Sequence, residues 1–341
     1  MQGGFYDENV FIFSIVINLR NNAWSMEVGE MNTIVIGGTN SQKLALHVAK
    51  HIKAQYSSLF VDHFPDGEIR IKFKEDLAGK HVVLINSLLP RPNESLMESV
   101  FAIHTAKSLG AKKVTFVTPY LAYMRQDKSF HPGECISAQV MAKLLSIADH
   151  VIAIDPHLHR IKRLSQIFKC KATSITADAV FAEYIKQTHP KAILIGPDSE
   201  SSQWAKDIAD KIGSESMILS KKRYSPTKVR TIIHGNPARF KKRDVVIVDD
   251  IISTGNTMIE PIMQLKKFGA RKITCICVHG VFAKNALQKL KKLGVTVIST
   301  NTVQNPVAKI DVSQLIAGSL CRKPSMVSEH AQEPLRRWFL T

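Results

Sequence analysis

An acidic pair followed by a loop rich in hydroxyl groups is the part of this chain best suited to chemistry. Within the run Asp244–Met258, the apolar residues 245–248 predict a buried parallel strand that delivers Asp249 and Asp250 to the edge of a sheet. The loop after them, which leads into a helix, consists of Ser253, Thr254, Gly255, Asn256 and Thr257. Free N–H groups and hydroxyls at a helix start can bind phosphate, and nearby carboxylates can hold sugar hydroxyls or a hydrated magnesium ion. The whole run predicts a site for a phosphorylated ribose. The acidic pair by itself would not, because a buried strand followed by a solvated turn would explain it equally well.

The bulk properties indicate a globular protein that binds anions. Of the 341 residues, 45% are hydrophobic and 22% are charged, and the formal net charge is +17. We expect nucleotides and sugar phosphates rather than nucleic acid as partners, because Lys and Arg are scattered without interleaved aromatic residues or finger spacing. The five cysteines form no C-x-x-C pair, which is typical of free thiols in a reducing cytoplasm. The apolar run Val10–Leu19 is too short to cross a membrane and follows no basic segment, so we expect neither a membrane span nor a signal peptide.

The chain contains the same structural unit twice. The segment that starts at Lys80 and the segment that starts at Arg243 both read as strand, loop, helix and strand. Where the second copy has the acidic pair, the first has Asn86 and Ser87, so we expect the first copy to have lost the sugar-phosphate site. Repeated units of this kind predict an α/β fold of two tandem duplicated domains, each a mostly parallel sheet flanked by helices. The expected divisions are an extension at 1–30, domains at 31–173 and 174–320, and a tail at 321–341.

Apolar periodicity predicts the elements of these domains. The expected strands are Thr33–Ile36, Leu59–Phe64, Ile69–Phe73, Val82–Ile85, Val114–Thr118, Val151–Asp155, Ala192–Gly196, Met217–Leu219, Thr231–His234, Val245–Asp249, Ile273–Val278 and Val295–Ser299. The expected helices are Gln42–Lys53, Glu94–Leu109, Ile136–Ile147, Ala177–Gln187, Ser202–Ile212, Thr257–Phe268 and Lys284–Leu293.

Two further loops carry residue types that suit a nucleotide. The run Phe64–Glu68 reads F-P-D-G-E between two expected strands, and its Asp-Gly pair is in the first place a hairpin turn. On a long loop after a strand, Arg125 stands beside Gln126 and Asp127. Such a loop suits a triphosphate, because the guanidinium offers a planar fork of donors to phosphate oxygens.

Histidines and a run of cations complete the candidate residues. A lone histidine is more often structural, but His157 and His159 follow Asp155 at the expected end of a strand, which favours a ligand role. Lys221 and Arg223 belong to a cationic run, which would ordinarily be a solvated face.

From 32 to 312 these motifs, in the same order, resemble those of ribose-phosphate pyrophosphokinases of the type I phosphoribosyltransferase superfamily, and the loops are most similar to archaeal-type members. The resemblance implies two phosphoribosyltransferase-like domains. It also implies transfer of the β,γ-diphosphoryl group of Mg-ATP to the anomeric hydroxyl of ribose 5-phosphate, giving 5-phosphoribosyl 1-diphosphate and AMP for nucleotide biosynthesis. A magnesium cofactor is implied as well, together with a homo-oligomer, a dimer or a multiple of dimers, in which the Phe64–Glu68 loop reaches ATP bound to a neighbouring subunit.

The resemblance also implies a role for each residue. It implies that ATP is bound by Phe64, Asp66, Gly67, Glu68, Arg125, Gln126 and Asp127, and ribose 5-phosphate by Arg223, Asp249, Asp250, Ser253, Thr254, Gly255, Asn256 and Thr257. Lys221 and Arg223 are expected to be catalytic, and His157 and Asp198 are expected at the metal. His159 has no counterpart in the family and is expected to be structural.

One loop departs from the family pattern. P-D-S-E-S-S follows the strand expected at Ala192–Gly196, where the family often has small residues such as Gly-Gly. Asp198 is retained, but Glu200 adds a like charge and Ser201 replaces a permissive glycine. A catalytically weak or silent regulatory paralogue therefore stays open as an alternative. A nucleobase phosphoribosyltransferase would share the acidic loop but would not need the F-P-D-G-E motif or a duplicated domain.

Overall fold

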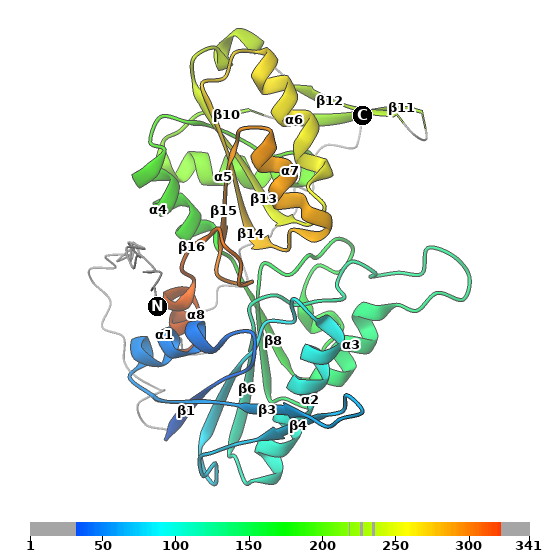
Figure 1. The fold of residues 1–341 in the computed structure, drawn as a ribbon, viewed down its shortest axis with the longest axis vertical. Helices are drawn as coiled ribbons and strands as arrows, with labels where there is room; N and C mark the ends of the chain where they lie inside the picture. Colours follow the sequence, from blue (N-terminus) through cyan, green and yellow to red (C-terminus); the bar gives the residue numbers. More distant parts are fainter. Residues whose placement is uncertain (1–31, 218, 226–227, 234–235, 322–341) are drawn as a thin grey trace, which may run out of the picture.

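Two parallel sheets, one in each half of the chain, form the framework of the protein (Figure 1). The structure is a computed structural model that describes residues 32–321 except 218, 226–227 and 234–235. The first sheet has the strand order β2-β1-β5-β6-β7-β8, and the second has the order β10-β9-β13-β14-β15-β16. Because the two orders are the same when each half is counted from its own first strand, the predicted duplication and α/β class are confirmed.

The halves also share the order of their elements. The first contains β1 (Thr33–Gly37), α1 (Gln42–Ile52), β2 (Gln55–Ser58), β3 (Phe60–His63), β4 (Ile69–Lys72), β5 (His81–Ile85), α2 (Pro92–Ser108), β6 (Lys113–Thr118), α3 (Ser137–Leu145), β7 (His150–Ile154) and β8 (Lys171–Ile175). The second contains α4 (Asp178–Thr188), β9 (Ile193–Ile195), α5 (Ser199–Ile212), β10 (Ser216–Met217), β11 (Leu219–Ser225), β12 (Lys228–Ile233), β13 (Asp244–Ile252), α6 (Asn256–Lys267), β14 (Lys272–Gly280), α7 (Ala286–Lys292), β15 (Thr296–Thr300), β16 (Ala308–Ile310) and α8 (Ser313–Cys321). Each half inserts an antiparallel hairpin between its second and third sheet strands, β3–β4 in one and β11–β12 in the other.

The elements form where the sequence can bury them. Every residue of β1 and β5 is buried, as expected for parallel strands covered by helices on both faces. The helix α1 buries Leu44, Ala45, Val48, Ala49 and Ile52, a spacing that lines one face of a helix. Among the described residues, none of the helices is both long and apolar enough to cross a membrane.

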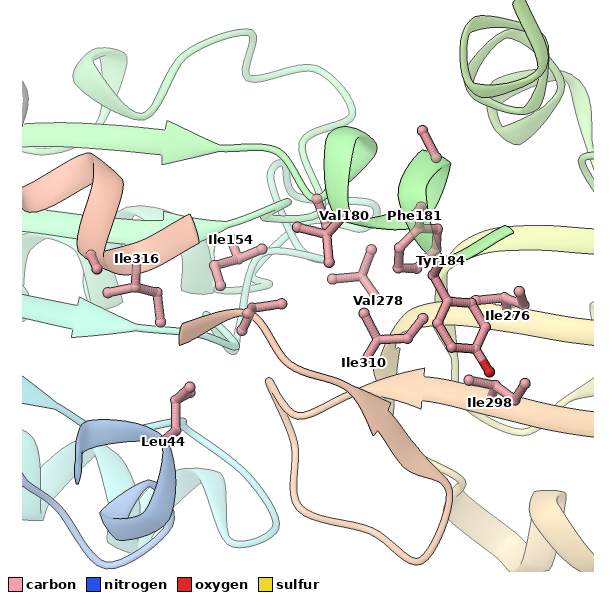
Figure 2. Close-up of a cluster of buried hydrophobic side chains, with 14 of the residues drawn as sticks. Leu44, Ile154, Val180, Phe181, Tyr184, Ile276, Val278, Ile298, Ile310 and Ile316 are labelled. Carbon is pink, nitrogen blue, oxygen red and sulfur yellow. The ribbon is translucent and has the colours of Figure 1, made fainter. Parts of the chain in front are cut away.

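One hydrophobic core joins the two halves. Its buried side chains include Leu44 and Ile154 from the first half and Val278 and Ile310 from the second (Figure 2). The last helix, α8, returns to the first half and packs on α1. The halves are therefore held together by shared apolar packing.

Three local predictions were wrong. Strand β13 does not end at Asp249 but continues to Ile252, because β14 runs on beside it to Gly280 and pairs with it in parallel. The segment around Lys221, which lies between two expected strands, itself forms β11 of a hairpin. Helix α5 begins at Ser199 rather than three residues later, because the Asp198 carboxylate caps it by accepting the Ser201 N–H at 3.0 Å.

The domain division depends on the edge strand β8, which spans Lys171–Ile175 and belongs to the first sheet. The division expected after Thr173 lies inside this strand, and we propose to move it to 176–177. The edge strands β2, β8 and β16 were not predicted, since they have no continuous apolar run, and helix α8 was not predicted either. The expected extension at 1–30 and the tail after Cys321 lie outside the described residues.

Candidate active site

A cleft of about 520 Å³ lies between the halves at the carboxyl ends of β7, β9 and β13. Several predicted site residues line it together: Arg125, His157, Asp198, Asp249, Asp250 and Thr257. Ligands of open α/β sheets bind at this edge. A second cleft, of about 370 Å³, is lined by Lys191, Glu215 and Arg243 among others and contains none of the predicted residues.

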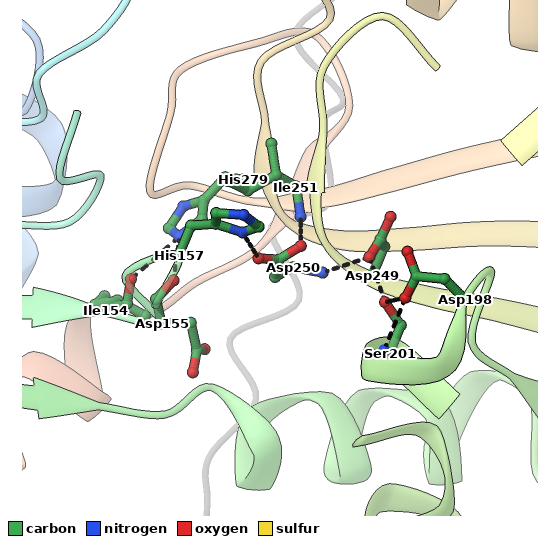
Figure 3. A network of polar contacts seen from close by, with 9 residues as sticks. All are labelled: Ile154, Asp155, His157, Asp198, Ser201, Asp249, Asp250, Ile251 and His279. Atoms are coloured by element: carbon green, nitrogen blue, oxygen red, sulfur yellow. Dashed lines mark hydrogen bonds and ion pairs between the residues drawn. The ribbon is translucent and has the colours of Figure 1, made fainter. Parts of the chain in front are cut away.

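Acidic groups form a row along the cleft (Figure 3). At one end Asp250 Oδ2 lies 2.7 Å from His157 Nδ1, which joins the second half of the chain to the first. At the other end the Ser201 hydroxyl lies 2.7 Å from Asp249 Oδ1 and 3.0 Å from Asp198 Oδ1. Ser201 has one proton and donates it to one carboxylate at a time. The serine that departs from the family pattern is therefore part of the site.

The two adjacent carboxyl groups differ in their affinity for a proton. Burial raises the pKa of Asp249 well above its ordinary value, and the charge of Asp250 raises it further. Burial also opposes ionisation of Asp250, but the hydrogen bond and positive charge of His157 lower the pKa of that carboxyl below its ordinary value. Of the two carboxyl groups, Asp249 therefore binds a proton more readily, and a cation that enters the cleft would favour ionisation of both.

The turn after β13 has the backbone of a phosphate cradle. Gly255 has a φ of 74°, a left-handed conformation that favours glycine, and it stands immediately before the first residue of α6. Ser253 and Thr254 lie in this turn, Asn256 is the first helical residue, and Thr257 lines the cleft. The N-terminus of α6 thus begins beside the acidic row, where its N–H groups favour an anion.

Of the predicted nucleotide loop, Arg125 alone lines the cleft. The carboxylate of Asp127 accepts hydrogen bonds from the backbone N–H and the guanidinium of Arg160, at 2.8 and 2.9 Å. The Gln126 carbonyl accepts the Ala138 N–H at 3.3 Å. These two residues hold the loop in shape, and Arg125 extends from it into the cleft.

The run Phe64–Glu68 forms the turn of the β3–β4 hairpin. The Phe64 N–H donates to the Glu68 carbonyl at 2.8 Å, Gly67 has a φ of 93°, and the Glu68 N–H donates to Asp66 Oδ1 at 3.1 Å. The Phe64 side chain is 46% exposed. None of these residues lines the cleft of its own chain.

Lys221 and Arg223 lie in β11 of the equivalent hairpin in the second half. Their backbones are opposite Thr231 and Val229 of β12. The hairpin projects from the second half (Figure 1) and is followed by β13, the strand that carries the acidic pair.

The equivalent place in the first half is filled by the protein itself. The Asn86 amide nitrogen donates to Glu98 Oε1 at 3.2 Å, and its oxygen accepts the Asn40 N–H at 3.2 Å. The Ser87 hydroxyl donates to the Thr302 carbonyl at 2.6 Å. The residues that replace the acidic pair are buried and serve internal hydrogen bonds.

Sequence reasoning missed two residues beside the cleft. It treated Ser201 only as a departure from a pattern, and it gave His279 no role. A single histidine within an apolar strand gives no signal of its partner 125 residues away in sequence, Ile154.

Comparisons with known proteins agree with this architecture. A family model described as the N-terminal domain of ribose phosphate pyrophosphokinase matches residues 33–148, and a model of the phosphoribosyl transferase domain matches residues 164–316. The ribose-phosphate pyrophosphokinase of Methanobrevibacter smithii is 33% identical over 84% of this chain and 99% of its own length. That of Methanothermobacter thermautotrophicus is 36% identical over 83% and 98%. The crystal structure of phosphoribosylpyrophosphate synthetase from Mycobacterium smegmatis matches with a TM-score of 0.74 and 27% identity, over 85% of this chain and 97% of that one.

The fold and the cleft define a protein with two phosphoribosyltransferase-like domains. With relatives above 30% identity along nearly their whole length, the chain belongs to the ribose-phosphate pyrophosphokinase family.

Proposed function

We propose that this chain transfers the β,γ-diphosphoryl group of Mg-ATP to the anomeric hydroxyl of ribose 5-phosphate, giving 5-phosphoribosyl 1-diphosphate and AMP. The observation that carries the proposal is the composition of the cleft. It joins Asp249, Asp250 and Thr257 of the second half to Arg125 and His157 of the first. A sugar-phosphate loop and a nucleotide loop thus face one space, as a transfer between two anionic substrates requires.

Each group of residues has a distinct task in this proposal. The turn from Ser253 to Thr257 binds the 5-phosphate at the start of α6, and Asp249 and Asp250 hold the ribose hydroxyls. Arg125 binds the triphosphate, with Gln126 and Asp127 shaping its loop. The anomeric oxygen attacks the β-phosphorus in line, the bond from that phosphorus to the AMP oxygen breaks, AMP leaves, and the proton of the anomeric hydroxyl is released to solvent. Lys221 and Arg223 neutralise the charge on the migrating group.

The residues present fit a magnesium ion that arrives with the substrate phosphates. Among the described residues, no three His, Cys, Asp or Glu side chains form a ready metal cage. The acidic row nevertheless supplies carboxylate oxygens at Asp198, Asp249 and Asp250, and Mg²⁺ commonly combines one or two carboxylates with phosphate oxygens. We propose that Asp198 holds the ion and that His157 lies beside it. Bound there, magnesium would neutralise phosphate charge.

We also propose a homo-oligomer, a dimer or a multiple of dimers. The helices α2 and α3 contact each other and expose Met97, Phe101, Val140 and Leu144, each at least 40% accessible. Such a surface suits a second copy of the chain. The exposed Phe64–Glu68 tip, which does not reach its own cleft, then has a neighbouring ATP site to complete. The five free thiols suit a cytoplasmic location.

The alternative of a silent regulatory paralogue is less well supported. It would explain the Glu200 departure, but it would not require the retained Lys221, Arg223, Asp249 and His157. A nucleobase phosphoribosyltransferase activity would not require the first half of the chain.

The catalytic assignment is tested by paired substitutions in β11. Lys221→Ala should lower kcat by at least ~10²-fold with little change in KM, because it removes charge stabilisation that develops in the transfer. Lys222→Ala removes a cation from the next position and is the matched control, with kcat expected near that of the unchanged protein. An equal effect of both substitutions, or none at Lys221, would remove Lys221 from the reaction.

A further inference from the structure

His279 joins the two halves of the chain behind the acidic row. It lies near the end of β14 in the second half and is 1% exposed. Its Nε2 lies 3.1 Å from the Ile154 carbonyl oxygen and 3.2 Å from that of Asp155, at the end of β7 in the first half (Figure 3). The ring of Tyr120, also from the first half, packs edge-on against the His279 imidazole, with the two ring centroids 5.0 Å apart.

These contacts determine which ring nitrogen carries the proton. Two carbonyl oxygens can only accept, so Nε2 must be the donor. In the neutral ring Nδ1 is then an acceptor, and it lies 2.9 Å from the Thr302 hydroxyl, which donates its one proton either to Nδ1 or to the Val278 carbonyl oxygen, also at 2.9 Å. Burial lowers the pKa of His279 to about 4, which keeps the ring neutral near pH 7.

The peptide held by His279 has an unusual conformation. Asp155 has a φ of 34°, which residues other than glycine seldom adopt and which surrounding contacts must maintain. Its N–H donates to the Ile175 carbonyl at 2.9 Å, and its carboxylate accepts the Ala177 N–H at 2.8 Å. His279, which belongs to the second half of the chain, binds the carbonyl oxygen of Asp155.

Two residues further on, the same loop presents His157 to Asp250. Asp250 belongs to β13, and its neighbour Ile251 is paired with His279 in the adjacent strand β14. Adjacent strands of the second sheet thus hold one loop of the first half at two points. His279 binds the backbone of the loop, and Asp250 binds the side chain of His157.

We propose that His279 is a positioning residue, which acts through the backbone of the 154–155 segment to set His157 against Asp250 in the cleft. Its catalytic consequence rests on the proposed function. The structural part of the proposal is that Nε2–H of His279 donates a hydrogen bond from the second half of the chain to the first. This part is independent of the proposed function and can be measured without an activity assay.

The catalytic part is tested with a double-mutant cycle. His279→Leu removes the donor and should lower kcat about tenfold, whereas His279→Gln keeps an N–H near the Nε2 position and should recover most of the rate. In a His157→Ala background, His279→Leu should cause little further loss, because the residue through which it acts is gone. Losses that multiply in the double variant, or a Gln variant as slow as Leu, would overturn the proposal.

A matched control separates positioning from stability. His150→Leu removes another buried imidazole, at the opposite end of β7, where Nε2 lies 2.8 Å from Thr173 Oγ1. It should lower the thermal midpoint without the coupling to His157. If it couples to His157 in the same way, the effect of His279 is one of general stability and the proposal fails.

The structural part is tested by ¹⁵N NMR of histidine-labelled, full-length protein at pH 7.5, with no substrate. The His279 signal, assigned by its loss in His279→Gln or its shift in Thr302→Val, should be that of a neutral ring with the proton on Nε2. A proton on Nδ1, or a charged ring, would contradict the proposal even if the protein makes AMP. The expected tautomer in a protein that makes none would instead count against the proposed function alone.

Discussion

Asp249 and Asp250 are adjacent in sequence, yet the pKa values of their carboxyl groups are shifted in opposite directions. The pKa of Asp249 is raised by burial and by its neighbour, whereas the pKa of Asp250 is lowered by His157 despite burial. Asp249 Oδ1 accepts the Asp250 N–H at 3.1 Å, and the Ser201 hydroxyl lies 2.7 Å from the same oxygen. A buried carboxyl group that is already hydrogen-bonded and whose pKa is raised is suited to bind hydroxyls or a cation when substrate arrives.

Replacing Asp249 by Asn should therefore affect sugar binding more than folding. Asp249→Asn keeps an acceptor for Ser201 but loses the charged acceptor, and we expect the KM for ribose 5-phosphate to rise roughly tenfold. The thermal midpoint should stay the same or rise, because a buried carboxyl is removed. Both variants are compared by steady-state kinetics. Asp207→Asn, at an exposed position on α5, is the control. An unchanged KM and turnover would show that the sugar site is elsewhere.

At the scale of elements, the equivalent hairpins show how the duplicated units diverged. One hairpin carries the Phe64–Glu68 tip and the other carries Lys221 and Arg223, and both occupy the same place in the strand order. Equivalent inserts thus carry the residues that we propose to bind a neighbouring ATP and those that we propose to be catalytic. The sheets beneath them kept one order, because each must bury the same apolar faces.

The strands of the first sheet also contain groups that make stability depend on pH. His81 at the start of β5 and His150 at the start of β7 are buried, with Nε2 of each 2.8 Å from a threonine hydroxyl. Burial first, and then the charge of nearby lysines, lowers the pKa of each to about 4. Among the described atoms, the His81 Nδ1 has no hydrogen-bond partner, so a proton there would be poorly accommodated.

We therefore expect the free energy of unfolding to fall at acid pH. Between pH 6.5 and about 4 the unfolded chain binds more protons than the folded one, so stability is full above this range and is lost as the pH falls through it. At pH 5 each histidine should cost about 2 kcal/mol of unfolding free energy relative to pH 7.5. Urea unfolding at both values tests this. His81→Gln/His150→Gln should reduce the difference, and an identical pH dependence would contradict the assignment.

At the scale of the whole molecule, the sequence predicted the framework better than the contacts between its halves. Buried strands such as β5 and β13 have continuous apolar runs, and repetition of the unit made the duplication visible. The β11 strand was missed because its cations show no apolar alternation, and its order comes from pairing with β12. The α8–α1 packing and the His279 contacts join residues far apart in sequence, for which no local pattern exists.

The assembly adds a prediction that no single chain can satisfy. If the Phe64–Glu68 tip completes the ATP site of a neighbour, each active site is composite. Asp66→Ala and Lys221→Ala chains should each be inactive, but mixing them under conditions of subunit exchange should restore part of the activity, because some hybrid sites have both residues intact. If activity stays absent although exchange is demonstrated by mass spectrometry, the tip and the catalytic strand of each site belong to one chain.

The most direct test of the account is product analysis with ATP, ribose 5-phosphate and Mg²⁺, followed by ³¹P NMR. The account predicts AMP and 5-phosphoribosyl 1-diphosphate in equal amounts, no ADP, and no AMP when ribose 5-phosphate is omitted. ADP as the nucleotide product would mean transfer of a single phosphoryl group. No turnover from a folded protein that still binds ribose 5-phosphate would contradict the enzymatic function and favour the silent paralogue.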